Sequence, residues 1–357
     1  MEKLFEKIDS EIKSNLNSLV DTKNWNTYRG VFANSIEKRL NNFFSAKSLL
    51  TNSGSSTIEL CLRVLNIGRG DEVIIPSFTF VATAQAVLMV GATPVLCQTD
   101  DSFNLSANEL EKKINKKTRA VIFVHLFGNP TGIEEVKKIC DKNGLYLVED
   151  CAQGFGAAIG NKKAGTFGDC SAFSFNSCKH FSCGDGGLFL TKSEKLFIKA
   201  KGIRHAGLIE KNKDFISYLI GGKNLMTEFQ AAVLLPQIKR IDTIIDDRIK
   251  NGSMITNKLS QINGIQTQKC EKNATHVFQR IVFLAENQNK AKKIIANNEL
   301  IERVYPRALS EEPIIKKFGL IDEKTRNIGL DFWKRHASIT FLPFVDYKNF
   351  VNAFELK

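Results

Sequence analysis

Between about residues 48 and 205, short apolar segments alternate with stretches of helical periodicity, and this alternation constrains the fold more than any other feature of the chain. Five of these segments predict β-strands, at about 48–51, 72–75, 93–97, 120–125 and 145–149. Strands separated by helices usually pair in parallel, because each helix returns the chain to the edge of the sheet where the next strand begins. We therefore expect an α/β fold, in which a mainly parallel sheet is covered by helices on both faces.

The pattern changes after about residue 245, which suggests two domains. Further helices are predicted at about 1–20, 35–44 and 227–250, and further strands at about 277–284 and 301–304. The sequence Ser106-Ala107-Asn108-Glu109 matches a capping box and predicts that a helix begins there and runs to about residue 114. We expect a large domain over 1–245, with a helical N-terminal segment, and a small α+β domain over 246–357.

Charge and cysteine content limit the possible partners. The chain has 357 residues and a formal net charge of +12, with lysines scattered along it rather than clustered among aromatics. This distribution disfavours nucleic-acid binding and favours a small phosphorylated or nucleotide-linked substrate. The eight cysteines show no paired CxxC spacing, so we expect no metal site and no disulfide framework. The N-terminus is charged and amphipathic, and no apolar run is long enough to span a bilayer, so we expect a cytoplasmic protein with no membrane partner.

Two segments at the ends of predicted strands suit a ligand with a phosphate group and a planar ring. The first, 52–57, reads Asn-Ser-Gly-Ser-Ser-Thr and opens a predicted helix. Hydroxyl side chains and free backbone N–H groups at a helix N-terminus bind phosphate, although the same residues also make an ordinary N-cap. The second, 76–83, follows a strand at the position where open α/β sheets bind ligands. An aromatic side chain of this segment either stacks on a ring or packs in the core.

Asp150 and Lys179 are the charged residues that the pattern singles out. Asp150 ends an apolar strand, so its carboxylate either pairs with a cation such as a protonated pyridine nitrogen or caps the next helix. Lys179 lies between an apolar segment containing Ser174 and the glycine-rich turn 184–187. A lysine between buried strands is costly unless it is neutralised, and condensation with an aldehyde neutralises it; the alternative is a surface lysine. Together with the two segments above, these residues meet the requirements of pyridoxal phosphate chemistry.

Four segments carry a resemblance to a known family: GRGDEVIIPSFTFVATAQAVLMVGATPV, VHLFGNP, LVEDCAQGFGA and GTFGDCSAFSFNSCKHFSCGDGG. They resemble the DegT/DnrJ/EryC1/StrS sugar aminotransferases, which have the aspartate aminotransferase (type I) fold with a seven-stranded sheet and use pyridoxal 5'-phosphate. The resemblance implies that Lys179 binds the cofactor aldehyde, that Asp150 pairs with the ring nitrogen and that Gln153 contacts the ring hydroxyl. It also implies stacking of the ring on Phe80 and binding of the cofactor phosphate by Ser55, Ser56 and Ser174.

The resemblance further implies a homodimer with shared active sites. Residues 221–228 are similar to the segment by which family members reach the phosphate in the neighbouring subunit, and Lys223 or Asn224 is expected to make that contact. Relatives often have asparagine where this chain has Lys223 and arginine where it has Leu225.

The family implies transfer of an amino group from an amino acid, L-glutamate being the first choice, to the keto group of a nucleotide-linked deoxysugar. A ketocyclitol such as an inosose is the alternative substrate. Dehydratases of the family replace the lysine by histidine, and Lys179 argues against that reaction. Candidate partners of a substrate diphosphate, each of which is alternatively a solvated surface residue, are Arg204, Arg303 and Arg307.

Overall fold

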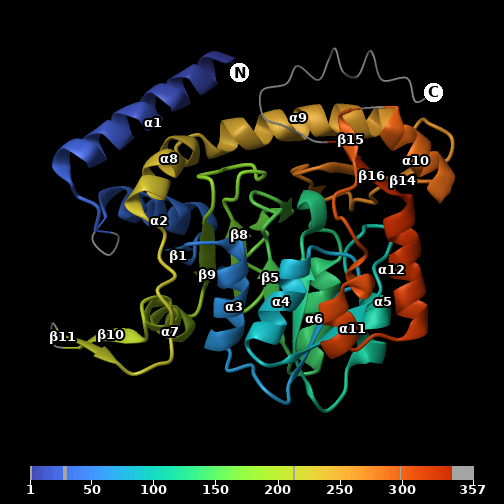
Figure 1. Ribbon diagram of the computed structural model, residues 1–357, viewed down its shortest axis with the longest axis horizontal. Coiled ribbons are helices and arrows are strands. Elements are labelled where there is room, and N and C mark those ends of the chain that lie inside the picture. The colour runs from blue at the N-terminus through green and yellow to red at the C-terminus, as the bar shows by residue number, and fades with distance from the viewer. Residues whose placement is uncertain (1, 27–29, 212–213, 298, 340–357) are drawn as a thin grey trace.

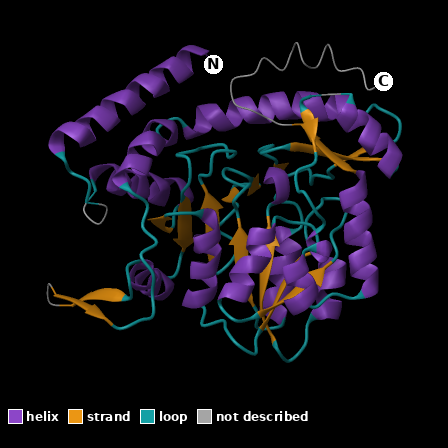
Figure 2. Ribbon diagram, in the orientation of Figure 1, coloured by secondary structure: helices purple, strands orange, loops and turns teal. Residues whose placement is uncertain are grey.

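The computed structural model describes residues 2–26, 30–211, 214–297 and 299–339, and all elements below lie within these ranges (Figure 1). Residues 340–357, the last part of the predicted small domain, lie outside them. A central sheet is enclosed by helices, and the long helix α9 passes along one end of it toward a second, smaller sheet (Figures 1 and 2). No helix of the described residues is both long and apolar enough to cross a membrane.

The central sheet has seven strands in the order β1-β9-β8-β5-β4-β2-β3. Their bounds are β1 (Lys47–Thr51), β2 (Glu72–Pro76), β3 (Thr93–Cys97), β4 (Thr118–Val124), β5 (Tyr146–Asp150), β8 (Cys170–Ser174) and β9 (Gly187–Thr191). Strand β9 is antiparallel to both of its neighbours, whereas β8, β5, β4, β2 and β3 pair in parallel. The prediction of a mainly parallel, seven-stranded sheet is confirmed.

Side chains of the strands alternate between the two faces, and each face is covered by helices. In β4, Ile122 packs in a cluster with α3 and α4, whereas Phe123 packs in a cluster with α6. Both residues are fully buried, which explains why the strands read as continuous apolar runs. The helices are α1 (Glu2–Thr22), α2 (Val31–Phe44), α3 (Gly54–Val64), α4 (Val81–Met89), α5 (Ala107–Leu110), α6 (Ile133–Lys142), α7 (Glu194–Arg204), α8 (Glu228–Ile238), α9 (Ile241–Leu259), α10 (Gln288–Ala296), α11 (Pro313–Phe318) and α12 (Glu323–Arg335).

Two helix predictions need correction. The predicted helix 227–250 is two helices, α8 and α9, because the chain leaves helical geometry at Arg240, where φ is −126° and ψ is 30°. The predicted capping box at Ser106 is wrong: the Ser106 side chain makes no cap hydrogen bond, and the carboxylate of Glu109 pairs with Lys112 at 2.7 Å. The helix α5 is correspondingly short and continues as the 3₁₀ turn Glu111–Lys113.

The C-terminal part forms a four-stranded antiparallel sheet in the order β12-β14-β16-β15. Its strands are β12 (Ile265–Thr267), β14 (Ile281–Ala285), β15 (Ile301–Glu302) and β16 (His336–Ile339). Strand β14 begins later than predicted because the chain turns at Phe278, whose φ is +46°. The predicted domain boundary at 245/246 falls inside α9 and stays a prediction.

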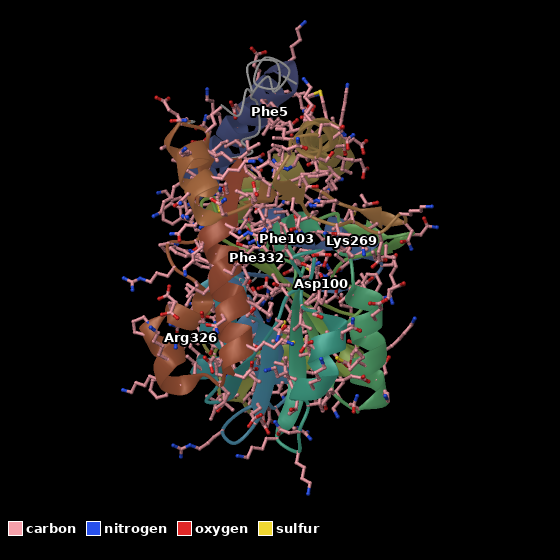
Figure 3. All side chains as sticks on the ribbon, turned by 90° about the vertical axis from the view of Figure 1, so that its right-hand side faces the viewer. Phe5, Asp100, Phe103, Lys269, Arg326 and Phe332 are labelled. Atoms are coloured by element: carbon pink, nitrogen blue, oxygen red, sulfur yellow. The ribbon has the colours of Figure 1, made fainter. Side chains whose placement is uncertain are left out.

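Helix α12 packs this C-terminal part against the part that contains the central sheet. Figure 3 shows its Phe332 beside Phe103, and the two rings meet edge to face with centroids 4.7 Å apart. The ring centroid of Phe332 also lies 4.3 Å from that of Phe78, which follows β2 of the central sheet. The contact holds the two parts together beside the C-terminal ends of the central strands.

Short strands in two further small sheets complete the structure. They are β6 (Ala158–Ile159), β7 (Lys162–Lys163) and β13 (Ala274–Thr275) in one sheet, and β10 (Leu208–Lys211) with β11 (Asp214–Ser217) in a hairpin. The hairpin extends away from the rest of the molecule (Figure 1). Beyond its second strand, Tyr218 and Ile220 are strongly exposed, at 54% and 89%.

Candidate active site

A cavity of about 370 Å³ opens where the central strands end, between the N-termini of α3 and α4 and residues of the C-terminal part. Val124, Asp150 and Ser174, the last residues of three neighbouring parallel strands, all line it. This is the position at which α/β sheets bind ligands, because the strand ends and the loops after them converge there. Six predicted site residues line this cavity: Ser55, Phe80, Asp150, Gln153, Ser174 and Lys179.

Asp150 supplies a buried carboxylate at the end of β5. Its side chain is 4% exposed, and its two oxygens accept hydrogen bonds from the Thr83 hydroxyl (2.9 Å) and the Ala152 backbone N–H (3.1 Å). Burial raises the pKa of Asp150, and the two hydrogen bonds and the charge of Lys179 only partly offset this. The carboxylate thus lacks a close cation among the described residues, and a cationic ligand group would stabilise its charged form.

Lys179 lies in the loop between β8 and β9 and reaches the same cavity while remaining partly exposed to solvent. Burial of its ammonium group lowers the pKa of Lys179, the positive charge of Arg280 adds to this effect, and Asp150 and Cys178 oppose it. A lowered pKa gives the amine a larger neutral fraction, which is the form that reacts with an aldehyde and accepts a proton.

The N-terminus of α3 forms the end of the cavity that suits a phosphate group. Ser53 is the N-cap, and its hydroxyl accepts a hydrogen bond from the Ser56 N–H (3.2 Å). Gly54 lies so close to β8 that a Cβ atom there would be 2.7 Å from the Cβ of Ser174. This contact brings the exposed Ser55 and the Ser174 hydroxyl to the same helix end, where backbone N–H groups and the helix dipole favour an anion.

Gln153 and Phe80 lie on two sides of the cavity. The Gln153 side-chain oxygen accepts a hydrogen bond from the Phe127 N–H (2.7 Å), and its amide nitrogen donates to the Tyr305 hydroxyl (3.1 Å). These bonds fix the amide, which keeps a second N–H for a ligand. Phe80 caps α4 without a side-chain hydrogen bond and is 52% exposed, with its ring 6.0 Å from that of Tyr305. Its exposed face suits stacking on a planar ligand.

Three predicted cofactor-binding residues do not line the cavity. Ser56 uses its hydroxyl within the turn before α3, where it donates to Asn52 Oδ1 at 2.6 Å. Lys223 and Asn224 follow the β10–β11 hairpin; Lys223 pairs through its backbone with His205, and the Asn224 carbonyl accepts from the Asn52 N–H at 3.1 Å. Their side chains therefore stand outside the cavity of their own chain.

The three arginines suggested for a diphosphate also lie outside the cavity lining. Arg204 is not a solvated residue: it is 7% exposed and its Nη1 donates to Leu50 O (2.6 Å) and Glu37 Oε1 (3.0 Å). Arg303 donates to the carbonyl oxygens of Trp333 and Lys334 at the end of α12. These two arginines thus bind the protein itself, a result that contradicts both of the roles offered for Arg204.

The structure adds four residues that sequence reasoning did not assign to the site: Thr83, Gln279, Arg280 and Tyr305. Thr83 could have been predicted from the sequence, because it lies in the segment 76–83. It follows Thr79 by one helical turn, and the two hydroxyls share a hydrogen bond. The other three belong to the C-terminal part. The segment 305–310 resembles a substrate-side loop of the family, whereas the residues around Gln279 and Arg280 carry no such resemblance. Gln279 contacts the loop of Lys179, since its amide donates to the carbonyl of the preceding residue, Cys178, at 2.9 Å.

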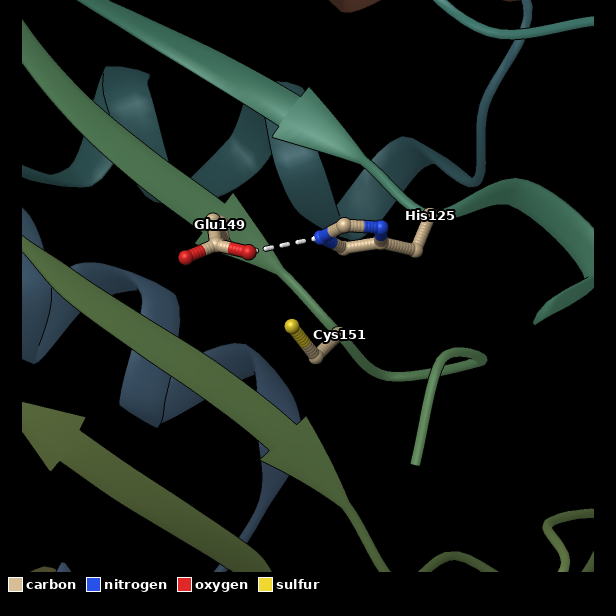
Figure 4. Close-up of side chains that lie close together, drawn as sticks. All are labelled: His125, Glu149 and Cys151. Carbon is tan, nitrogen blue, oxygen red and sulfur yellow. Dashed lines mark hydrogen bonds and ion pairs between the residues drawn. The ribbon is translucent and has the colours of Figure 1, made fainter. Parts of the chain in front are cut away.

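A buried network holds the residues on either side of Asp150 in place. Glu149 accepts hydrogen bonds from His125 Nε2 (2.8 Å) and from the backbone N–H groups of residues 165, 167 and 168 (each 2.7 Å). Figure 4 shows this pair with Cys151, and all three side chains are buried. The carboxylate oxygens of Glu149 are fully engaged, so the group acts as a scaffold for the end of β5 rather than as a set of metal ligands.

Comparison with protein families decides the identity. The model of the DegT/DnrJ/EryC1/StrS aminotransferase family matches residues 6–328. The chain belongs to this family. Among its relatives, GDP-perosamine synthase of Vibrio cholerae is 35% identical over 240 residues, which are 67% of this chain and just under two thirds (65%) of that protein.

Two further similarities concern another relative and the fold. A putative L-glutamine:3-amino-2,3-dideoxy-scyllo-inosose aminotransferase of Micromonospora echinospora is 34% identical over 242 residues, covering 66% of this chain and 58% of that protein. A structure described as a putative sugar aminotransferase of Streptococcus pneumoniae in its PLP form has the same fold, with a TM-score of 0.85 and 22% identity over 95% of this chain and 93% of that one. The predictions of the family, the fold and a sugar aminotransferase that depends on pyridoxal phosphate are confirmed.

The side chains of the cavity fit pyridoxal phosphate. Asp150 lacks the close cation that a protonated pyridine nitrogen supplies, the helix end at Ser55 and Ser174 suits the phosphate, and Phe80 offers a ring face. Lys179 lines the same cavity with a lowered pKa, as an aldehyde-binding amine requires. These individual roles remain predictions that rest on this geometry.

Proposed function

We propose that this aminotransferase moves the amino group of an α-amino acid, L-glutamate being the first candidate, onto the keto group of a nucleotide-linked deoxysugar. The observation that carries the proposal is the single cavity into which Lys179 and the buried Asp150 both open. The nucleotide-linked substrate is supported by the similarity to GDP-perosamine synthase and by the net charge of +12, which favours an anionic diphosphate.

In this proposal the bound cofactor supplies a ring that accepts electrons from the carbon that loses its proton. Asp150 holds the proton on the ring nitrogen, because a buried carboxylate stabilises an adjacent cation. Lys179 would take the proton from the α-carbon of the amino donor as a general base and would give up that proton again as a general acid. Ser55, Ser174 and the N-terminus of α3 hold the phosphate, and Gln153 orients the ring through its hydroxyl.

A ketocyclitol is the second candidate substrate. The support is the similarity to the Micromonospora echinospora protein, whose name describes an inosose aminotransferase. Both candidates present a ring ketone to Lys179, so they differ in what lies beyond the cavity rather than in the chemistry inside it.

A substrate panel tests the proposal. The holoenzyme is first converted to its aminated form with L-glutamate or L-glutamine, which changes the absorption of the cofactor. Keto-deoxysugars linked to GDP, UDP or dTDP, and inososes, are then added singly, and recovery of the original spectrum marks the acceptor. Recovery with a sugar nucleotide supports the first candidate, and recovery only with an inosose supports the second. If no ring ketone restores the spectrum, the proposed function is wrong.

We further infer a homodimer in which Lys223 or Asn224 reaches the phosphate site of the partner subunit. Both residues lie outside the cavity of their own chain and follow a hairpin that projects from the molecule. Exposed apolar side chains at the hairpin, among them Ile220, are typical of an interface. Light scattering should give twice the chain mass of 40.0 kDa, and a monomeric mass would contradict the inference.

We also propose that the protein is cytoplasmic. All eight cysteines lie among the described residues, and all are free thiols. Five of them are buried, and free thiols at that number are typical of a reducing compartment.

A further inference from the structure

Arg280 lines the active-site cavity without an assigned role. It comes from the turn before β14, in the C-terminal part of the chain, and lines the cavity together with Lys179 and Tyr305. Its charge contributes to the lowered pKa of Lys179, so its guanidinium is near enough to act on that amine. A permanent positive charge near Lys179 is suited to bind an anionic group of a ligand.

The backbone that carries Arg280 is fixed from several sides. Gln279 donates its N–H to the Phe127 carbonyl (2.8 Å) and its side-chain amide to the Cys178 carbonyl (2.9 Å). The Phe278 and Gln279 carbonyls accept hydrogen bonds from Nη2 of the buried Arg248, at 2.9 and 3.1 Å. Arg280 is thus tied both to the loop of Lys179 and to the large domain, which gives its guanidinium a defined starting point for binding a ligand.

The guanidinium is only partly engaged. Its Nη1 donates to Glu302 Oε1 (2.6 Å) and to Ser338 Oγ (3.4 Å), and these are the hydrogen bonds that the described residues give it. The edge formed by Nε and Nη2 is left for a ligand, and two parallel N–H donors of this kind match a carboxylate. The side chains of Arg280 and Glu302 are 17% and 51% exposed, so the ion pair is partly solvated and leaves Arg280 with attraction for a second anion.

The size of the cavity decides which anion fits. A volume of about 370 Å³ is at the small end for ligand pockets, and a bound cofactor would take up part of it. A group that reaches Arg280 must therefore lie close to the carbon that reacts at Lys179. The α-carboxylate of an amino acid is attached to that carbon, whereas the diphosphate of a sugar nucleotide is separated from the ketone by the sugar ring.

We propose that Arg280 is a binding residue for the α-carboxylate of the amino donor. The inference rests on the proposed function, since it requires an α-amino acid as donor. Contact with this carboxylate orients the α-carbon so that its proton faces Lys179, while the nucleotide-linked acceptor depends on residues farther out. The variant Arg280→Gln should therefore impair the donor half of the reaction and leave the acceptor half intact.

The test measures binding by calorimetry on the holoenzyme, apart from turnover. Two probes are compared. The first is the α-methyl analogue of the donor, which keeps the α-carboxylate but has no α-proton to lose. The second is the same analogue with its α-carboxylate converted to an amide. The wild type should bind the acid about 10- to 100-fold more tightly than the amide, as expected for a charge-assisted bidentate contact. In Arg280→Gln the acid and the amide should bind with nearly equal affinity. The preference of Arg280→Lys for the acid should lie between those of the wild type and Arg280→Gln.

A matched control is Arg326→Gln. Arg326 also lies in the C-terminal part and pairs with a glutamate, Glu311 at 2.9 Å, but it does not line the cavity. Its removal should leave the preference for the acid unchanged. Retention of the cofactor absorption in each variant shows that the site remains assembled.

The outcomes separate this inference from the proposed function. If Arg280→Gln prefers the acid as strongly as the wild type does, the inference is overturned, while transamination by both proteins leaves the proposed function standing. An unchanged donor half-reaction with weakened binding of the sugar nucleotide would also overturn it and assign Arg280 to the diphosphate. Failure of the wild type to react with any amino acid would contradict the proposed function itself.

Discussion

Replacing Asp150 by asparagine tests the central electrostatic argument of the site. Asp150 is 4% exposed and accepts hydrogen bonds from Thr83 and Ala152, which the asparagine oxygen can still partly satisfy. The change therefore removes a charge more than it removes structure. Two unit charges about 4 Å apart interact by roughly 4 kcal/mol at an effective dielectric constant of about 20. Since 1.36 kcal/mol is about tenfold in rate, Asp150→Asn should slow transamination by about a thousandfold.

The assay is a single-turnover measurement of the donor half-reaction, followed through the absorption of the cofactor. Asp150→Asn should retain the cofactor, because the phosphate contacts are elsewhere, and lose rate. Thr83→Val is the graded comparison: it keeps the carboxylate and removes one hydrogen bond, so about a tenfold loss is expected. A rate for Asp150→Asn within about threefold of wild type would refute the pairing of Asp150 with the ring nitrogen.

The raised pKa of Asp150 provides a second test that needs no turnover. In the apoprotein, the native state holds a proton on Asp150 at pH values above the usual pKa of 3.8, where the unfolded chain has released it. The native state then binds more protons than the unfolded state, so this group lowers the free energy of unfolding as pH rises through that window. Asp150→Asn removes the effect, and its stability relative to wild type, measured by urea unfolding of both apoproteins, should increase between pH 4 and pH 8. A constant difference would contradict the assigned shift.

Three further predictions concern the cofactor and the frame around it. Borohydride reduction of the holoenzyme should attach the cofactor to Lys179, and peptide mapping that finds the label on another lysine would reject that role. Alanine at Ser55 or Ser174 should weaken cofactor binding about tenfold. The Ser56 hydroxyl lies in the turn before α3, so Ser56→Ala should lower the free energy of unfolding by about 1 kcal/mol and leave cofactor affinity within about threefold. The reverse order of effects would exchange the roles of these serines. Arg204→Met should destabilise the protein by about 3 kcal/mol, read from urea unfolding, because it leaves buried acceptors without a donor.

The order of strands and helices, and the residues at the ends of the strands, could be predicted from the sequence. Apolar runs bounded by turn residues determine where strands form, and their alternation with helices determines that most of them pair in parallel. Asp150, Ser174 and Ser55 follow from this order, because the C-terminal ends of parallel strands meet at one edge. Together with Lys179 these residues indicated pyridoxal phosphate chemistry, and the family resemblance then gave each of them a role.

Contacts between distant parts of the chain were decided by the tertiary structure alone. Arg280 lines the same cavity as Lys179 because the sheet of the C-terminal part packs beside the strand ends, and no local pattern encodes that approach. The same holds for Arg204, which is buried by a helix and a strand that lie far from it in sequence. Periodicity reports which face of an element is apolar, but it does not report which other element covers that face.

The helix corrections follow from the same physical limit. The capping box at Ser106 has suitable residues, yet the Glu109 carboxylate pairs with Lys112 and leaves the box unmade. Helices α8 and α9 share a continuous pattern, yet the chain turns at Arg240, so that α9 begins on the same core as α8 and ends on the core of the C-terminal part. Sequence determined which interactions were possible at each position, and tertiary packing selected among them because competing partners differ by only about 1 kcal/mol.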